Sequence, residues 1–194
     1  MSNLDKSNKH NAEQQRRQFI KLASAASLGL PFFHIASASA KTYMSLEEAQ
    51  TLLFPDASLS PRSITLTKDQ AKAIKKASKV RVNYREMKAW RSSDGGWFLL
   101  EQIIGKHENI DMAFALDNKG RVLGMEVITY RETYGHEIRH PKWRAQFHGK
   151  DSSERLKLDK QIKNISGATL SCKHVTDGVN RLTHTWQLVL QHIT

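Results

Sequence analysis

The chain has 194 residues, of which 39% are hydrophobic and 25% charged. This composition is that of a globular protein and excludes disorder throughout, and the length suits one domain with a short appendage. The formal net charge of +11 favours an anionic partner, such as nucleic acid or a membrane surface. Cys172 is the only cysteine, which excludes an internal disulfide, a cysteine-based zinc site and C-x-x-C-H haem attachment.

The first 40 residues have the pattern of an export signal. The stretch QQRRQFIK at residues 14–21 resembles a twin-arginine signal. The apolar run at residues 22–35 is shorter than the roughly 20 residues that a spanning helix needs. Ala36, Ala38 and Ala40 then give two A-x-A cleavage options. We therefore expect a periplasmic protein whose signal peptide is cleaved near residues 38–40; the alternative is an amphipathic N-terminal helix.

Cleavage there would remove five basic and two acidic residues and leave a net charge of +8. The remaining charges are scattered except for one dense cluster, which consists of Lys68, Lys72, Lys75, Lys76 and Lys79. On a helix, these lysines would form a solvated face. Because the chain also lacks the interleaved basic and aromatic residues of known nucleic-acid modules, we expect no nucleic-acid partner.

Two short helices are predicted in an N-terminal helical extension, residues 41–79. Ser45, with Glu48 three residues later, forms a capping box that opens a helix ending before Pro55. Thr67 precedes KDQAKAIKKAS, whose apolar residues recur at helical spacing. The rest of the mature chain, residues 80–194, is predicted to be a single domain.

Strands dominate the first half of that domain. Residues 80–90 alternate as a strand does, a turn follows at 92–96, and residues 97–105 return as its partner. The clearest hairpin covers residues 111–132, with its turn at 117–120. Charged residues 151–161 and an apolar stripe from Leu170 to Ile193 then predict helices. The fold class is therefore α+β: an antiparallel sheet from about residue 80 to 130, covered by helices from both ends.

The stretch ISGATLS, residues 165–171, carries the first chemical signal. Ser166, Gly167 and Ala168 are small, so backbone amides can approach an anion closely. A helix is predicted to begin directly afterwards, and its N-terminus favours a phosphate. Thr169 places a hydroxyl at the same point. On spacing alone the signal is weak, because many helices begin with such a turn.

SGATLS, followed by KHVTDGVNRL, resembles the flavinylation motif of the FMN-binding domain family. That family includes the flavin-carrying subunits of the sodium-pumping NADH:quinone oxidoreductase and of the Rnf complex. In the family, a magnesium-dependent flavin transferase joins FMN to the threonine of S-G-A-T through a phosphoester. The resemblance implies attachment at Thr169, with these cofactor-binding neighbours: Ser166, Gly167, Ala168, Leu170 and Ser171.

Further family features lie upstream in the expected order. The D-x-x-G hairpin turn at residues 117–120 precedes an E-T-x-G loop at 132–135, and Trp143 and a Q-F-x-G-K segment at 146–150 follow. The resemblance covers roughly residues 80–185. It implies that Glu132, Thr133 and Gly135 line the flavin ring, with Trp143 and Phe147 as candidate packing partners. The alternative for both aromatic residues is packing in the core.

The chain departs from the family pattern at two positions. Members often have an acidic residue shortly before S-G-A-T, where this chain has Lys163, and Asp159 is the nearest acid. Tyr134 replaces the more usual proline of the E-T-x-G loop. The first departure could make modification of Thr169 inefficient or require a matched transferase.

Residues 136–140 spell H-E-x-x-H, the zinc signature of metalloproteases. That site requires His136 and His140 on one face of a continuous helix. Gly135 precedes the motif and Pro141 follows it, and a proline disfavours helical backbone at the residue before it. We therefore interpret the stretch as a loop that continues E-T-x-G, and we predict no metal site.

The favoured function is a periplasmic flavoprotein with covalent FMN that transfers electrons within an extracytosolic redox chain. Its partners would be a flavin transferase and cytochrome- or quinone-linked redox proteins at the membrane or in the periplasm. One alternative is a flavin-dependent reductase of a small periplasmic substrate, and another is a binding module that holds FMN loosely or not at all. The absence of a second cofactor motif in the mature chain favours the carrier.

Overall fold

The computed structural model describes residues 40–193, so the predicted export signal lies outside the described residues except for its last position. These residues form one six-stranded antiparallel sheet in the order β1-β6-β5-β4-β3-β2. The strands are β1 (Lys41–Thr42), β2 (Leu59–Thr65), β3 (Glu86–Ser92), β4 (Trp97–Ile104), β5 (Asn109–Leu116) and β6 (Val122–Tyr130). The α-helices of this part are α2 (Leu46–Leu53), α3 (Lys68–Ser78), α4 (Pro141–Arg144) and α5 (Thr169–Leu188). This architecture confirms the predicted α+β class.

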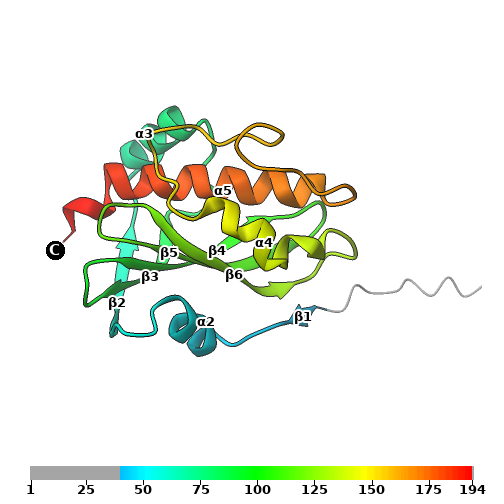
Figure 1. The fold of residues 1–194 in the computed structure, drawn as a ribbon. Helices are drawn as coiled ribbons and strands as arrows, with labels where there is room; N and C mark the ends of the chain where they lie inside the picture. Colours follow the sequence, from blue (N-terminus) through cyan, green and yellow to red (C-terminus); the bar gives the residue numbers. More distant parts are fainter. Residues whose placement is uncertain (1–39, 194) are drawn as a thin grey trace, which may run out of the picture. The chain divides into compact units, whose positions relative to one another are not determined.

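Helices cover both faces of the sheet (Figure 1). The long helix α5 crosses one face, with α3 beside its C-terminal end, and α2 lies against the opposite face. Side chains alternate accordingly along β4: Leu99 and Ile103 join the core under α5, whereas Phe98 joins the smaller core under α2. Full burial of each such side chain contributes about 1.5–3 kcal/mol.

Two contacts fix α5 on the sheet. A Cβ added at Gly178 would lie only 2.6 Å from the Cδ1 atom of Ile103, so the helix approaches β4 closely at that point. One turn further on, Arg181 donates two hydrogen bonds to the carboxylate of Glu101, at 3.0 and 3.2 Å. Both side chains of this pair are nearly buried, so losing either partner would leave an uncompensated charge.

Both predicted helix starts are confirmed. The Ser45 hydroxyl accepts from the amide of Glu48 at 3.1 Å, and the Glu48 carboxylate accepts from the amide of Ser45 at 2.7 Å. Thr67 and Gln70 form the same reciprocal pair at the start of α3. Each capping box satisfies two amides that a helix leaves without internal partners.

The sheet contains two strands that the sequence did not predict. Both lie within the predicted helical extension, residues 41–79. Strand β1 pairs with β6 and β2 pairs with β3, so they form the two opposite edges of the sheet. Pro61 lies within β2, and such a residue is tolerated only at an edge because it cannot donate to a neighbouring strand. In addition, β3 begins only at Glu86, since Val82 packs beneath α3 instead of extending the strand.

The helix predicted at residues 151–161 is wrong. This segment forms turns, and Leu156 lies deep in the core. Its N–H donates to Oδ1 of Asn180 and its carbonyl accepts from Nδ2 of the same side chain, each at 2.9 Å. Its apolar residues Leu156 and Leu158 are two apart, which does not match helical spacing. A buried asparagine on α5 therefore satisfies the backbone groups that a helix would have paired internally.

The predicted C-terminal helix is confirmed with two changes. It ends at Leu188 and is followed by a separate 3₁₀ turn, Leu190–His192. Leu170, expected on the apolar stripe, is 45% exposed in the first turn. Across residues 40–193, no helix has both the length and the apolar character that crossing a bilayer requires.

Candidate functional site

The segment before α5 presents Thr169 to solvent. Gly167 has a φ of +86°, a left-handed conformation, and nothing lies within 4 Å of where its Cβ would be. The side-chain amide of Asn164 donates to Thr169 Oγ1 at 3.0 Å, and its carbonyl oxygen accepts from the amide of Ile165 at 2.9 Å. Asn164 thereby fixes the path of the segment and the position of the threonine hydroxyl.

Helix α5 begins without a cap. Ala168 occupies the N-cap position with φ −114° and ψ 17°, and no side chain bonds to the first turn. The first helical hydrogen bond runs from the amide of Cys172 to the carbonyl of Ala168 at 2.9 Å. The amides of Thr169, Leu170 and Ser171 thus precede the helical ladder, and they make a positive, hydrogen-bonding end.

A hollow of about 440 Å³ opens beside this helix start, and we name it the α5 hollow. Three segments line it: the turn between β4 and β5, the loop after β6 and the start of α5. Its residues are Lys106, His107, Glu132, Thr133, Tyr134, Gly167, Ala168, Thr169, Leu170 and Ser171. The structure therefore brings together residues 132–134 and 167–171 of the two predicted segments, which lie more than thirty residues apart in the chain. Gly135 and the exposed Ser166 do not line the hollow.

Glu132 supports the wall of the α5 hollow rather than offering a free carboxylate. Its Oε1 atom accepts from the backbone amides of His107 and, at 3.0 Å, Glu108. Burial alone would raise the pKa of this carboxyl, but the amide hydrogen bonds outweigh burial and lower it. The ionised side chain thus holds the β4–β5 turn against the loop that follows β6.

Gly135 and Tyr130 clamp that loop to α5. The Tyr130 hydroxyl donates to the carbonyl of Tyr134 at 2.5 Å and lies 3.1 Å from the hydroxyl of Ser171. A Cβ at Gly135, whose φ is +92°, would lie 2.6 Å from Ser171 Oγ and 2.7 Å from Tyr130 Oη. Burial raises the pKa of Tyr130 to about 12, so the hydroxyl keeps its proton at neutral pH.

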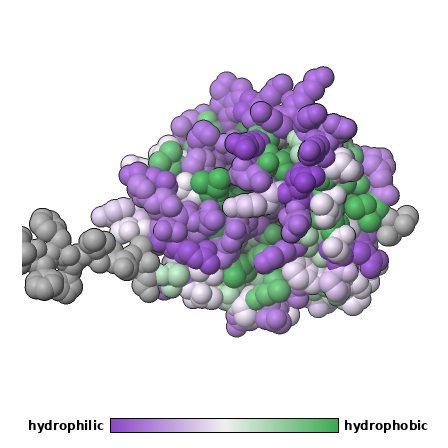
Figure 2. Space-filling view, turned by 180° about the vertical axis from the view of Figure 1, so that it is seen from behind, coloured by the Kyte–Doolittle hydropathy of each residue, from purple (hydrophilic) through white to green (hydrophobic). Residues whose placement is uncertain are grey.

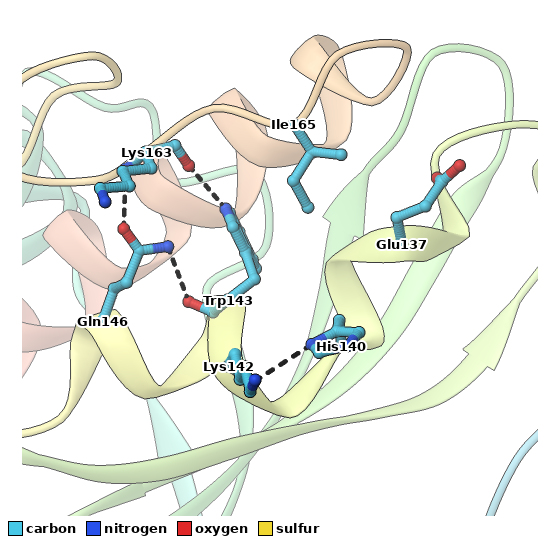
Figure 3. Close-up of a pocket in the computed structure, with 7 residues that line it drawn as sticks. All are labelled: Glu137, His140, Lys142, Trp143, Gln146, Lys163 and Ile165. Atoms are coloured by element: carbon cyan, nitrogen blue, oxygen red, sulfur yellow. Dashed lines mark hydrogen bonds between the residues drawn. The ribbon is translucent and has the colours of Figure 1, made fainter.

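Trp143 does not line the α5 hollow. It lies on α4 and lines a second hollow, the α4 hollow, with His140, Lys163 and Ile165 among its neighbours (Figure 3). Its indole N–H donates to the carbonyl of Lys163 at 2.8 Å, and its ring packs edge-on against Phe147. Trp143 therefore holds the segment that leads to Thr169 through the backbone of Lys163, from the α4 hollow and not from the α5 hollow.

Gln146 also holds the backbone of Lys163. Its side-chain oxygen accepts from the amide of Lys163 at 2.8 Å, and its side-chain nitrogen donates to the carbonyl of Trp143 at 3.0 Å (Figure 3). Both backbone groups of Lys163 are thus held while its side chain remains exposed. These hydrogen bonds use only the backbone of Lys163, so they do not depend on the side chain at this position.

The H-E-x-x-H stretch has the geometry of a loop. His136–Arg139 is a short 3₁₀ turn, and His140 leaves it with extended backbone, at φ −62° and ψ 123°, to become the N-cap of α4. Its ring nitrogen Nδ1 accepts from the amide of Lys142 at 3.3 Å. The two histidines therefore do not share one face of a continuous helix. Among residues 40–193, no group of three or more potential ligands is arranged to hold a metal ion.

Three further residues make structural contacts: Lys173 and Cys172 near the start of α5, and Phe147 in the 3₁₀ turn that follows α4. Lys173 pairs with Asp177 at 2.8 Å along the surface of α5 instead of facing the α5 hollow. Cys172 is fully buried, and burial raises the pKa of its thiol, which makes it a poor nucleophile. Phe147 belongs to the core.

Sequence reasoning did not identify Asn164, Tyr130, Lys106 or His107 as part of this site. Asn164 carried a signal, because an asparagine before a small-residue turn commonly bonds to nearby backbone. Lys106 and His107 carried none, since only the antiparallel pairing of β4 with β5 brings their turn to the start of α5.

The exposed threonine, the uncapped amides and the open glycine fit a phosphate group at the start of α5. The family model described as FMN-binding domain matches residues 105–184, from the β4–β5 turn through most of α5. No curated protein gives a significant match to the chain.

Proposed function

Residues 105–184 belong to the FMN-binding domain family, so the chain is a flavoprotein, and we propose that it carries FMN covalently through a phosphoester to Thr169. The observation that supports this linkage is the exposed hydroxyl of Thr169 at the uncapped start of α5, where the α5 hollow opens. The hollow would receive the cofactor beyond its phosphate. The amides of Leu170 and Ser171 would bind phosphate oxygens.

The attachment step requires Thr169 Oγ1 to form a bond to phosphorus. The threonine loses its hydroxyl proton, and the bond between phosphorus and the leaving group of a flavin nucleotide donor breaks, with no change of oxidation state. A separate flavin transferase would supply the base and the metal ion. In this chain, Asn164 keeps Oγ1 oriented and leaves its proton free, because the asparagine donates to the hydroxyl rather than accepting from it.

We propose that the protein transfers electrons within an extracytosolic redox chain. Bound FMN would supply chemistry that passes electrons singly or in pairs. The export pattern of residues 1–40 supports a periplasmic location, where a covalent bond would prevent loss of the cofactor. The partners would be cytochrome- or quinone-linked redox proteins in the periplasm or at the membrane.

The linkage is tested by co-expressing the chain with an active flavin transferase and measuring in-gel flavin fluorescence and intact mass. Wild type should give a fluorescent band that survives denaturation, and Thr169→Ala should give none. Thr67→Ala, which changes the threonine before α3 instead, is the matched control and should stay fluorescent. A dark wild-type band, or a fluorescent Thr169→Ala band, would contradict the proposal.

The position of the cofactor is tested with two variants of loaded protein. Tyr134→Ala removes a wall of the α5 hollow and should shift the flavin absorption spectrum or increase quenching by iodide. Trp143→Phe changes the α4 hollow and should leave both unchanged. The reverse result would place the ring in the α4 hollow.

Reduction of a small substrate by the loaded protein alone would favour the reductase instead of the carrier.

A further inference from the structure

The exposed side of α3 carries an unusually dense positive charge. Successive residues of a helix are turned by about 100°, so four lysines of α3 fall within an arc of about 100°. These are Lys68, Lys72, Lys75 and Lys76, and Lys79 follows at the C-cap; all five are exposed. We name this surface the lysine face. Figure 2 shows mainly hydrophilic side chains along the upper edge of the molecule, where α3 lies.

The side of α3 opposite to the lysine face is packed against the rest of the protein, so the helix cannot rotate to bury the lysines. Ile74 is completely buried and joins Leu66 and Val189 in a small core between α3 and the end of α5. Ser78, also buried, bonds back to the carbonyl of Ile74 at 2.7 Å. The lysine face is therefore a fixed outer surface of the fold.

The positive charges of the lysine face are not neutralised within the fold. Lys72 pairs with Asp69 at 3.3 Å, and both side chains are largely exposed. None of the other four lysines forms an ion pair with any residue in the range 40–193. Lysines three and four residues apart repel one another, and Lys68 lies in the first turn, where the helix dipole disfavours a cation. An external anionic surface would relieve both effects.

The lysine face lies far from Thr169. Helix α5 has 20 residues, which corresponds to a length of about 30 Å. Helix α3 packs against Val189, which follows the last residue of α5, whereas Thr169 is the first residue of α5 (Figure 1). A partner bound to the lysine face would therefore not contact the α5 hollow.

The chemistry of the lysine face favours lipid over an acidic protein. Stable protein interfaces have a desolvated centre with aromatic, arginine or large apolar side chains. The exposed residues of α3 are lysines, Asp69, Ala73 and Ala77, and they include none of these types. Flexible, strongly hydrated ammonium groups instead suit the diffuse negative charge of phospholipid headgroups.

We propose that the lysine face of α3 binds the surface of a membrane that contains anionic phospholipid. The binding itself is independent of the flavin. Only its consequence rests on the proposed function: the end of the molecule that carries Thr169 would remain directed away from the lipid and accessible to redox proteins.

The test is cosedimentation of purified protein with vesicles of phosphatidylcholine, with and without phosphatidylglycerol. Wild type should bind only the vesicles with phosphatidylglycerol, and less as salt is raised. Each lysine near an anionic surface contributes about a fivefold change in binding, so Lys75→Gln/Lys76→Gln should weaken binding by about tenfold or more. Lys41→Gln/Lys88→Gln removes the same charge from exposed sites on β1 and β3, and it should retain most of the binding.

Three results would overturn the proposal. They are failure of wild type to bind phosphatidylglycerol vesicles, equal binding to phosphatidylcholine alone, and equal loss in the two double variants. A fourth result would overturn it as well: unchanged vesicle binding by Lys75→Gln/Lys76→Gln, because the lysine face would then not be the surface that binds the lipid. Circular dichroism of each variant checks that α3 still folds. Because the experiment uses protein without flavin, it is unaffected if attachment at Thr169 fails.

Discussion

Helices α3 and α5 begin in opposite ways. Thr67 precedes α3 with extended backbone, at φ −67° and ψ 163°, and its hydroxyl accepts from the amide of Gln70 at 3.1 Å. Ala168 precedes α5 with a different backbone and has no side-chain acceptor to offer. A cap such as Thr67 stabilises a helix by about 1 kcal/mol. The start of α5 forgoes that stabilisation, and its amides remain available to a ligand.

The largest expected effect comes from detaching the loop after β6 from the start of α5. Gly135→Ala places a methyl group against Ser171 and Tyr130 in a left-handed conformation, and it should lower the free energy of unfolding by about 3 kcal/mol. Gly149→Ala is the matched control, since Gly149 also has a positive φ but has nothing within 4 Å of its added Cβ. It should cost about 1 kcal/mol. Equal losses in urea denaturation would show that the contact with α5 is unimportant.

The Tyr130 hydroxyl offers a pH-dependent way to test the same clamp. Its pKa is about 12 in the folded protein, against about 10 in an unfolded chain. Between these values the unfolded chain releases the proton first, so the contribution is fully present below pH 10 and declines by about 2 kcal/mol as pH approaches 12. Tyr130→Phe should lack this part of the alkaline decline. Denaturant titrations of both proteins at several alkaline pH values measure the difference; identical slopes would contradict it.

The contrast between the two helix starts is tested by a pair of threonine substitutions. Thr67→Ala should destabilise protein without flavin by about 1 kcal/mol, because it leaves the first turn of α3 uncapped. Thr169→Ala should cost less than about 0.5 kcal/mol, because its hydroxyl bonds only to the side chain of Asn164. Thermal unfolding of the two variants compares them directly. A larger loss for Thr169→Ala would mean that this residue is mainly structural.

The smallest expected effect on stability comes from Lys163→Asp. The side chain is exposed and only the backbone of Lys163 is used, so stability should change by no more than about 0.5 kcal/mol. If a flavin transferase reads an acid upstream of S-G-A-T, this variant should be loaded faster than wild type. The time course of in-gel fluorescence measures the loading. Lys160→Asp, which changes an exposed lysine three residues further from the motif, is the control.

Local signals predicted much of the fold. The capping residues at Ser45 and Thr67 placed two helices, and the Asn and Gly of the turn at residues 117–120 placed the hairpin of β5 and β6. Strand β2 was missed because Pro61 and several polar residues conceal its alternation. The segment at 151–161 was mispredicted because its conformation depends on Asn180, a residue of a distant helix.

The same limit applies to the site. A threonine in a small-residue turn before a helix is visible in the sequence, and so is the E-T-x-G loop. That these two segments meet depends on Tyr130 at the end of β6 and on the close fit of Gly135 to Ser171. The family pattern also predicts Trp143 beside the flavin ring, and this stays a prediction; in the structure the indole N–H of Trp143 donates to the carbonyl of Lys163. Tertiary contacts of this kind leave no periodic trace in the sequence.

The close approach at Gly178 has a mechanical consequence. Ile103 fills the notch that the missing side chain leaves, so α5 cannot slide lengthwise over β4 without a steric clash. The distance between Thr169 and the sheet is therefore fixed. Any adjustment of the distance between a group carried there and an approaching partner must come from the flanking loops or from the partner itself.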